Sequence, residues 1–389
     1  MTTRKDRNDQ ELEEYVQSDL DNAAVIHLGK IRENISLLRE KIGPKTRLLF
    51  AVKTDAYGHG LVPVAKEAVK SEVDYLGVSS IQEGIRLRDH EFQIPILAFN
   101  PPHGNQIEKA VHQNLTVTVT SLRHYREIEN HLRNKDSSLQ CQIIVDTGMS
   151  RLGVKPRCAV ELARNVDRGK TTTLTGIYSH LSSAGSKLQE DKKFTGSQIE
   201  SFRTVLKKLN SAELLPPLRH ISNSAGFLQF GQAVTADPLN MVRCGTVIYG
   251  YPEFPTSWSQ AVKPALGLFS RIIDTRLIPS GQFVSYGRTH QCKRPTSAAV
   301  FPLGYGHGLD RRLSNSGKVR VGGRKAPIIG KICCDKTIVD VTGIEPGIGE
   351  PVEVMGRDPT ALEQARSIGA DVVELTTGLT VPRLYIEPG

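Results

Sequence analysis

The sequence predicts a (β/α)8 barrel followed by a smaller, β-rich domain. Up to about residue 255, apolar segments of strand length alternate regularly with amphipathic segments of helical period. Beyond that point the rhythm changes to short β-type segments separated by Gly and Pro turns, which is typical of a small barrel or sandwich. A doubly wound sheet is the alternative for the first part, but no G-x-G-x-x-G dinucleotide turn supports it.

Three stretches are expected along the chain. Residues 1–22 are polar, lack the apolar core of a signal peptide and are predicted to be a disordered extension. Residues 23–255 are predicted to form the barrel, and residues 256–389 the β-rich domain. Within the barrel stretch, AAVIHL at 23–28 reads as a strand that can pair with the second domain, and IRENISLLREKI at 31–42 reads as an amphipathic helix.

Eight further strand candidates follow, which is the number that a (β/α)8 barrel requires. Helical patterns such as VAKEAVKSE, IQEGIRLRDHE and CAVELARNVDR lie between them. The eight candidates are residues 48–52, 75–79, 95–99, 116–120, 142–146, 174–180, 219–224 and 242–250.

Composition excludes several classes of protein. A formal net charge of +9 is compatible with nucleic-acid binding, but the basic residues are scattered and form no recognised motif. No apolar run approaches the roughly 20 residues of a transmembrane helix. The six cysteines show neither CxxC pairs nor metal-ligand spacing, so we expect reduced thiols, no metal site and a cytoplasmic location.

The most informative stretch is AVKTDAYGHG at 51–60, in which Lys53 directly follows the first barrel strand. Partial burial at a strand end lowers the pKa of a lysine and makes its amine a nucleophile or imine former. A lysine in this place can also be an ordinary surface residue. Other polar residues lie at the ends of later strand candidates, and a barrel gathers such residues on one rim. Asp146 and Arg151 follow the fifth candidate, His180 ends the sixth, Asn223 and Ser224 end the seventh, and Arg243 begins the last.

The stretch closely resembles the pyridoxal 5'-phosphate (PLP) attachment motif of alanine racemases. The resemblance continues to the end of the chain through blocks in the family's order, namely VDTGMSRLG, GIYSHLSSA, RHISNSAG, MVRCGTVIYG, VSYGRTH, GYGHGLDRRLSN and GKICCDKTIVDVT. It implies a PLP-binding barrel with a β-domain and a head-to-tail homodimer whose active sites are shared between subunits.

The resemblance also implies roles for individual residues. Lys53 would bind PLP as a Schiff base and act as one catalytic base, and Tyr286 of the partner subunit would be the opposite base. Arg243 would contact the pyridine nitrogen, and His180 would order Arg243 and Tyr286. The remaining implied contacts are Tyr57, Ser224, Gly245 and Thr246 around the phosphate, with Asn223 also on the cofactor, and Arg151, Cys334 and Tyr305 toward the substrate.

The chain departs from the family pattern at its substrate end. Ile144 stands where many members have a carbamylated lysine that orients the arginine seven residues on, here Arg151. Cys334 replaces a methionine, Lys336 a glutamine and His307 an aspartate, and Leu379 lies where a tyrosine is frequent. Because of these changes, a racemase that acts on another small amino acid, or on a broader range of amino acids, remains an alternative to an alanine racemase. A PLP-dependent decarboxylase of related fold and a weakly catalytic PLP-binding protein are further alternatives.

Overall fold

The computed structural model describes residues 10–133, 135 and 137–387. The described chain forms two compact units. The barrel unit comprises residues 32–56 and 64–262, and the β unit comprises residues 10–31, 57–63 and 263–387.

The barrel unit is built on one sheet of eight parallel strands, in the order β9-β2-β3-β4-β5-β6-β7-β8. Backbone hydrogen bonds from Asn240 to Arg219 (3.1 Å) and from Arg243 to Ser222 (3.2 Å) join the two ends of this order. The predicted barrel is therefore confirmed. Its strands are β2 (Arg47–Ala51), β3 (Tyr75–Val78), β4 (Ile96–Ala98), β5 (Thr116–Val119), β6 (Leu139–Ile144), β7 (Thr172–Tyr178), β8 (Leu218–His220) and β9 (Met241–Cys244).

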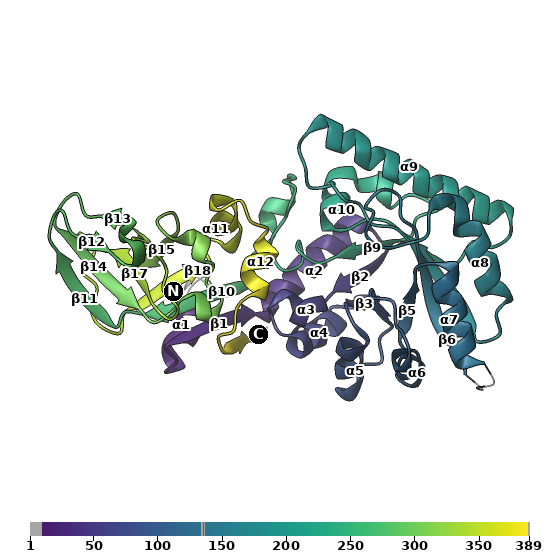
Figure 1. Ribbon diagram of the computed structural model, residues 1–389, viewed down its shortest axis with the longest axis horizontal. Helices are drawn as coiled ribbons and strands as arrows, with labels where there is room; N and C mark the ends of the chain where they lie inside the picture. Colours follow the sequence, from purple (N-terminus) through teal and green to yellow (C-terminus); the bar gives the residue numbers. More distant parts are fainter. Residues whose placement is uncertain (1–9, 134, 136, 388–389) are drawn as a thin grey trace, which may run out of the picture. The chain divides into compact units, whose positions relative to one another are not determined.

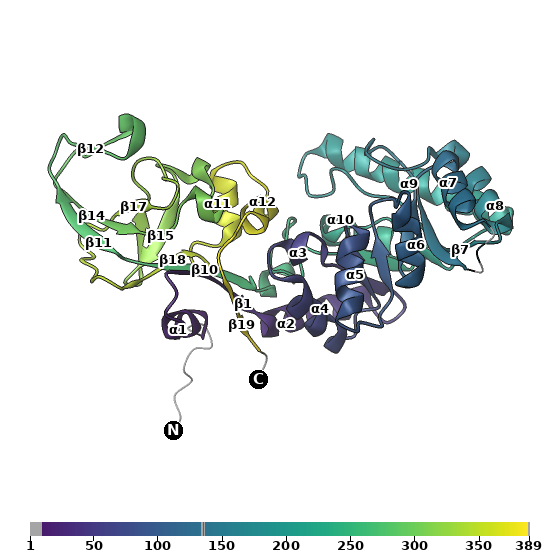
Figure 2. The same cartoon turned by 60° about the horizontal axis from the view of Figure 1, so that its bottom comes forward.

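Helices connect the successive strands and lie along the outside of this sheet (Figure 1). The views in Figures 1 and 2 agree that the long helix α9 runs beside α8. The helices are α2 (Leu28–Ile42), α3 (Lys53–Tyr57), α4 (Leu61–Lys70), α5 (Ile81–Asp89), α6 (Asn105–His112), α7 (Leu122–Leu132), α8 (Ala159–Arg168), α9 (Gln189–Ser211) and α10 (Ser224–Phe230).

Apolar side chains from the strands fill the barrel. Because helices cover the outer face of the sheet, the strands are buried on both faces, and most of their residues are apolar without alternation. One interior cluster takes one residue from each of seven strands and is made of Leu49, Tyr75, Leu97, Ile144, Tyr178, Leu218 and Met241.

The β unit contains a six-stranded sheet in the order β16-β15-β18-β10-β1-β19, a three-stranded sheet β11-β14-β17 and the β12-β13 pair. The early strand β1 (Asn22–His27) lies between β10 and β19, antiparallel to the first and parallel to the second. The other strands are β10 (Leu266–Arg271), β11 (Asp274–Ile278), β12 (Phe283–Val284), β13 (His290–Gln291), β14 (Thr296–Phe301), β15 (Lys318–Val321), β16 (Arg324–Pro327), β17 (Thr337–Asp340), β18 (Pro351–Met355) and β19 (Arg383–Ile386). Helices α11 (Ala361–Ser367) and α12 (Val372–Thr377) complete it.

Part of the predicted disordered extension is ordered. Residues 1–9 lie outside the described part of the chain, but Gln10–Gln17 form helix α1. The ring of Tyr15 is 1% exposed and stacks on Phe269 with 5.5 Å between ring centroids. The Tyr15 hydroxyl also donates a hydrogen bond to the carbonyl oxygen of Asp21 (2.9 Å). One buried aromatic ring thus anchors an otherwise polar segment to the six-stranded sheet.

Among the described residues, no helix is both long and apolar enough to cross a membrane. All six cysteines are free thiols. No group of three or more His, Cys, Asp or Glu side chains within the described ranges could hold a metal ion.

Candidate active site

Lys53 lies at the carboxyl end of β2, where the backbone takes an uncommon conformation. The segment Lys53–Tyr57 is a helical turn, but Thr54, Asp55 and Ala56 have φ of 55°, 51° and 56°, which is left-handed. Tyr57 follows with φ of 50°. The left-handed conformation costs roughly 1–2 kcal/mol for each residue that carries a side chain. Other contacts must therefore hold this turn.

Glu83, in the first turn of α5, supplies such contacts. Its Oε1 accepts hydrogen bonds from the backbone N–H groups of Thr54 (2.7 Å) and Asp55 (3.3 Å). Its Oε2 accepts from the backbone N–H and the hydroxyl of Ser79 (2.7 and 2.8 Å). The carboxylate thus ties the turn that follows β2 to the end of the neighbouring strand β3. Glu83 was not among the predicted site residues, because a glutamate in the first turn of a helix is ordinary.

The surroundings of Lys53 favour its neutral amine. Burial lowers the pKa of Lys53, and the positive charges of Arg151 and Arg243 lower it further, against an opposing effect of Glu83. An amine with a lowered pKa is available as a nucleophile at a lower pH than that of an exposed lysine. The structure therefore brings three predicted site residues, Lys53, Arg151 and Arg243, within electrostatic range of one another.

Arg243, on β9, is held by four hydrogen-bond contacts at this end of the barrel. Its Nη1 donates to Nδ1 of His220 (2.7 Å), and its Nη2 donates to Nδ1 of His180 (3.1 Å). Nη2 also donates to the carbonyl oxygens of Ser179 (2.7 Å) and Ile221 (3.3 Å). Burial lowers the pKa of Arg243 to about 10, so the guanidinium remains charged at neutral pH.

Both imidazoles beside Arg243 are neutral. A guanidinium has donors only, so each Nδ1 must accept, and each Nε2 then carries the proton. Burial and the charge of Arg243 lower the pKa of both His180 and His220 well below the ordinary value, which agrees with this assignment. His220 was not among the predicted site residues, although it lies in the RHISNS segment at the end of β8; one sequence cannot show that a strand residue points toward Arg243.

Three of the residues predicted around the phosphate, Ser224, Gly245 and Thr246, lie where β8 and β9 end. Ser224 begins α10, and its Oγ accepts a hydrogen bond from the backbone N–H of Gly245 (2.9 Å). Asn223 caps the same helix by accepting from the N–H of Gly226 (2.8 Å). The hydroxyl of Thr246 is buried and has no hydrogen-bond partner among the described residues. A phosphate oxygen is an acceptor that would satisfy this hydroxyl, so these residues fit a phosphate-bearing cofactor.

Arg151 follows β6 in a loop shaped by Asp146. The Asp146 carboxylate accepts from the N–H groups of Gly148 (3.1 Å) and Ser150 (2.9 Å) and pairs with Lys155 (2.6 Å). No hydrogen bond or ion pair of the Arg151 guanidinium is found among the described residues. Asp146 thus shapes the loop and forms an ion pair with Lys155, and it does not orient Arg151.

The remaining predicted residues belong to the β unit. Tyr286 lies between β12 and β13 with 68% of its surface exposed, and Tyr305 is 45% exposed. Ser285, with φ of 62°, donates through its hydroxyl to the carbonyl oxygen of Lys331 (2.5 Å) and so attaches the Tyr286 turn to the loop that contains Cys334.

The loop of Tyr305 is attached to the Cys334 loop as well. The N–H of Tyr305 donates to the carbonyl oxygen of Cys333 (3.0 Å), and the N–H of Gly306 donates to that of Cys334 (2.7 Å). A Cβ on Gly304 would lie 2.3 Å from the Cys333 oxygen, so only glycine permits this approach. The structure therefore gathers Tyr286, Tyr305 and Cys334 on adjoining loops of one unit.

Two more of the residues noted in the sequence belong to the β unit. Leu379 is 5% exposed, and the N–H of the next residue, Thr380, donates to the carbonyl oxygen of His307 (3.1 Å). Tyr57 begins the short segment 57–63 of this unit, and its neighbour Gly58 accepts a hydrogen bond from Nε of Arg383 (2.7 Å). The lysine motif is therefore divided between the two units after Ala56.

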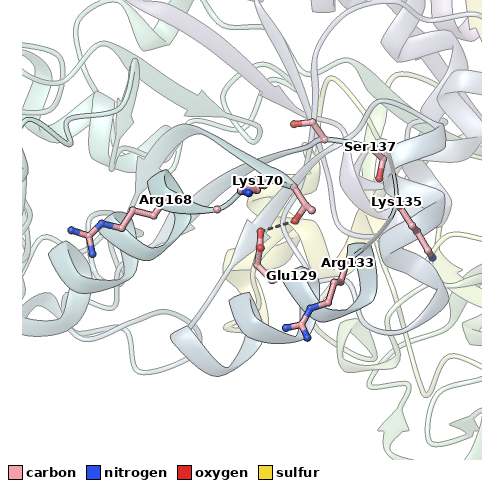
Figure 3. Close-up of a pocket in the computed structure, with 9 residues that line it drawn as sticks. Glu129, Arg133, Lys135, Ser137, Arg168 and Lys170 are labelled. Atoms are coloured by element: carbon pink, nitrogen blue, oxygen red, sulfur yellow. Dashed lines mark hydrogen bonds between the residues drawn. The ribbon is translucent and has the colours of Figure 1, made fainter.

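A different pocket lies at the amino ends of β6 and β7, away from the strand ends that carry Lys53 and Arg243 (Figure 3). Glu129 accepts a hydrogen bond from the hydroxyl of Thr171 there (2.6 Å). Figure 3 shows the charged ends of Arg133, Lys135 and Arg168 pointing in different directions, so they do not converge on a common ligand. This pocket is therefore a weaker candidate for an active site than the carboxyl end of the barrel.

Family models match both parts of the chain. The N-terminal domain of alanine racemase matches residues 26–253, and the C-terminal domain of alanine racemase matches residues 265–385. The chain belongs to the alanine racemase family. It is accordingly an isomerase, and the resemblance seen in its motifs is confirmed.

Relatives of known name agree over nearly the full length. "Alanine racemase 2" of Caldanaerobacter subterraneus is 32% identical over 373 residues, covering 94% of each chain. The alanine racemase of Halothermothrix orenii is 34% identical over 370 residues, covering 93% of this chain and 96% of the relative.

Solved structures of the family share the fold. The alanine racemase of Streptomyces coelicolor A3(2) gives a TM-score of 0.87 at 29% identity, covering 96% of this chain and all of that one. The alanine racemase of Bacillus anthracis, solved with bound L-Ala-P, gives a TM-score of 0.84 at 27% identity over 94% of this chain and 98% of that one.

Proposed function

We propose that the chain is a PLP-dependent racemase that interconverts L- and D-alanine with two catalytic bases. The observation that carries this proposal is the partly buried Lys53, whose pKa is lowered near a charged Arg243 that is held by hydrogen bonds from Nη1 and Nη2. This arrangement occurs in a chain that belongs to the alanine racemase family over nearly its whole length.

The cofactor proposal rests on the amine of Lys53 and on a set of hydroxyl and backbone N–H donors. Lys53 would hold PLP covalently, and Tyr57, Ser224, Gly245 and Thr246 would surround its phosphate, with Asn223 supporting Ser224. The buried hydroxyl of Thr246, without a partner among the described residues, supports this assignment. PLP, when bound, supplies an electron sink for the pair of electrons left when Cα of the amino acid loses its proton.

Arg243 would face the pyridine nitrogen and determine which reaction follows. Its pKa of about 10 keeps the guanidinium charged at neutral pH, and its partners fix its position. A guanidinium that keeps its proton makes the cofactor a weaker electron sink than a carboxylate partner would. A short-lived charge at Cα favours immediate reprotonation, which is racemisation, over slower side reactions.

The second base is proposed to be Tyr286 of the partner subunit in a head-to-tail homodimer. Tyr286 is exposed within its own β unit, as a residue that works in another subunit's site would be. His180 would order Tyr286. Its Nδ1 accepts from Arg243, so its Nε2–H would be the group that donates to the Tyr286 hydroxyl. Lys53 and Tyr286 would then take and return the Cα proton on opposite faces of the substrate.

The substrate carboxylate is proposed to bind Arg151 and the backbone N–H of Cys334, with Tyr305 at the entrance. Lys336, His307 and Leu379 lie on or beside the same loops and differ from the family pattern, so they are candidates for tuning substrate preference. We further propose a barrel domain over residues 23–255, with its first strand at 23–28 paired with the second domain, a second domain over 256–389, and a cytoplasmic location for this amino acid metabolism.

The direct test is to incubate purified, PLP-loaded protein with L-alanine and follow D-alanine by chiral chromatography, with carbon dioxide release measured in parallel. Formation of D-alanine supports the proposal. Release of carbon dioxide would identify a decarboxylase, and no turnover of any small amino acid would leave a PLP-binding protein. A parallel series with serine and other small amino acids shows whether alanine is preferred.

A further inference from the structure

We propose that Gln142 is a positioning residue that fixes the tautomer of His220 and thereby the placement of Arg243. Gln142 lies on β6 and is fully buried, and its Oε1 is 2.8 Å from Nε2 of His220. The effect on catalysis rests on the proposed function of Arg243. The tautomer itself is a property of the protein that can be measured without any activity.

The sheet has an opening that lets Gln142 reach His220 across the strand between them. Gln142 pairs with Gly176 on β7, and β7 pairs in turn with β8, which carries His220. A Cβ on Gly176 would lie 2.8 Å from Cδ of Gln142 and 3.1 Å from its Cγ. Only glycine at position 176 leaves room for the Gln142 side chain, so the Gln142–His220 contact depends on both residues.

The positions of the hydrogens follow from Arg243. Nη1 of Arg243 can only donate, so Nδ1 of His220 accepts and Nε2 of His220 carries the hydrogen. Nε2–H must then donate to an oxygen, which places Oε1 of Gln142 toward the ring and its amide nitrogen away from it. The reverse orientation would set two donors against each other.

A second contact fixes the plane of the imidazole. The ring of Tyr178 stacks on His220 with 5.0 Å between centroids and 6° between planes, and the Arg243 guanidinium lies 5.1 Å from the centroid of the Tyr178 ring. The Tyr178 hydroxyl donates to Oγ1 of Thr118 (2.8 Å), since the Thr118 hydroxyl itself donates to the carbonyl oxygen of Ala98 (2.8 Å). Stacking fixes the plane of the imidazole, while the Arg243 donor at Nδ1 and the Gln142 oxygen at Nε2 together favour the tautomer with its hydrogen on Nε2.

The amide nitrogen of Gln142 shows that the residue is not a simple filler. It is buried and has no hydrogen-bond partner among the described residues, which is unfavourable for a polar group. A methionine would fill the same space without that penalty. The carbonyl oxygen is therefore the part of the side chain that explains a glutamine at this place.

The proposal predicts what a carboxylate would do. Glu at position 142 would stabilise a proton on both nitrogens of His220, and a doubly protonated ring cannot accept from Arg243. Two charged or titratable groups act on His220. Arg243 from β9 acts through its charge, and Tyr178 from β7 acts through stacking. The contact from β6 is the neutral amide of Gln142. In Gln142→Glu the Arg243–His220 hydrogen bond is lost and the guanidinium shifts.

The primary test is 15N NMR of histidine-labelled holoenzyme, with the His220 signal assigned by its loss in His220→Asn. In the wild type we expect a neutral ring, protonated on Nε2 alone, from pH 6 to 9. An ordinary histidine, with a pKa of about 6.5, would be largely protonated on both nitrogens at the lower end of this range. In Gln142→Glu we expect both nitrogens to be protonated at the lower end of this range. A wild-type ring protonated on Nδ1, or a neutral ring in Gln142→Glu throughout, would overturn the proposal.

A second set of variants measures the effect on the cofactor and remains informative if Gln142→Glu does not fold. Gly176→Ala displaces the amide without changing its chemistry, and Gln142→Met removes the oxygen. For both we expect an altered absorbance band of bound PLP and a kcat lower by about 10- to 100-fold, as when the partner of a ligand-orienting histidine is lost. Wild-type spectra and kcat in both folded variants would overturn the proposal.

The matched control is Gln364→Met. Gln364 is also a buried glutamine, but it lies in the β unit, and its amide nitrogen donates to the carbonyl oxygens of Lys318 and Val354. We expect this variant to lose thermal stability while the His220 signal, the absorbance band and kcat remain unchanged. If Gln142→Met loses only stability in the same way, Gln142 is structural and the proposal fails.

Discussion

The carboxylate of Glu83 accepts a 2.7 Å hydrogen bond from the backbone N–H of Thr54, the first residue after Lys53. This bond joins helix α5 to a run of left-handed residues that would not hold this conformation on their own. The position of the lysine therefore depends on a residue thirty positions away in the chain. Replacing Glu83 should change the conformation of the turn after Lys53 more than the structure of the barrel.

We expect Glu83→Ala to lower the free energy of unfolding by about 2 kcal/mol, because hydrogen bonds to charged groups contribute roughly 1.5–3 kcal/mol. Urea unfolding measures this change, and PLP titration should show weaker cofactor binding. Glu161→Ala is the matched control: Glu161 is also the third residue of a helix but is exposed. Equal losses in the two variants would mean that Glu83 acts only as an ordinary first-turn carboxylate.

Lys53→Ala should abolish the visible absorbance of the lysine-bound cofactor. Lys53 is the lysine at the end of β2 whose pKa is lowered by burial, so no other amine is expected to replace it. Absorbance spectra of the wild type and the variant after PLP addition and dialysis check this. A wild-type protein that cannot be loaded with PLP at all would contradict the cofactor proposal itself.

The pH dependence of PLP loading should follow the lowered pKa of Lys53. The neutral amine attacks the aldehyde, so loading of the apoprotein should reach half its maximal rate at a lower pH than the reaction of an exposed lysine. Arg151→Met removes a positive charge that lowers this pKa, so the midpoint should move to higher pH. Arg157→Met, which removes an exposed arginine of the following turn, is the control and should leave the midpoint in place. An unshifted midpoint in Arg151→Met would refute the electrostatic coupling.

Sharing of active sites between subunits predicts complementation. Lys53→Ala and Tyr286→Phe should each lose about 10²- to 10⁴-fold in rate, the usual effect of losing a general acid or base. After the two inactive proteins are mixed and allowed to exchange subunits, about one quarter of wild-type activity should return, because half of the dimers are hybrids with one complete site. No recovery after proven exchange would place both bases in one subunit.

Ile144 makes the environment of Arg151 unusual for the family. Ile144 is 6% exposed and packs in the barrel cluster, where it can neither carry a carbamate nor pair with a guanidinium. We expect a small anion such as chloride to pair with Arg151 and to lower KM, since a charge-assisted pair of about 1.5–3 kcal/mol corresponds to roughly ten-fold or more in affinity.

KM for alanine in chloride-free buffer and with added chloride, for the wild type and Ile144→Lys, with and without bicarbonate, measures this effect. Chloride should act on the wild type, and bicarbonate should act on Ile144→Lys through carbamylation. If neither anion changes either protein, other side chains hold Arg151.

Local sequence pattern was sufficient to predict the barrel, and it indicated several residues of the candidate site. All eight predicted barrel strands are present, because strands buried on both faces require apolar runs that are visible in the sequence. Lys53, Arg151 and His180 were predicted from their positions at or after strand ends, since parallel strands bring those ends to one rim. Arg243 was predicted at the start of the last strand, and its role came from the resemblance to the family. The motif blocks then indicated the family, and the family models confirm it.

Tertiary structure decided what the pattern could not express. Helix α1 is largely polar in sequence, and it is ordered by tertiary contacts such as the packing of Tyr15 on Phe269. The roles of Glu83 and Gln142 likewise depend on partners that lie far along the chain, Thr54 and His220. A hydrogen bond between distant residues leaves no periodicity in the sequence, because its geometry exists only once the sheet has closed and set the register of its strands.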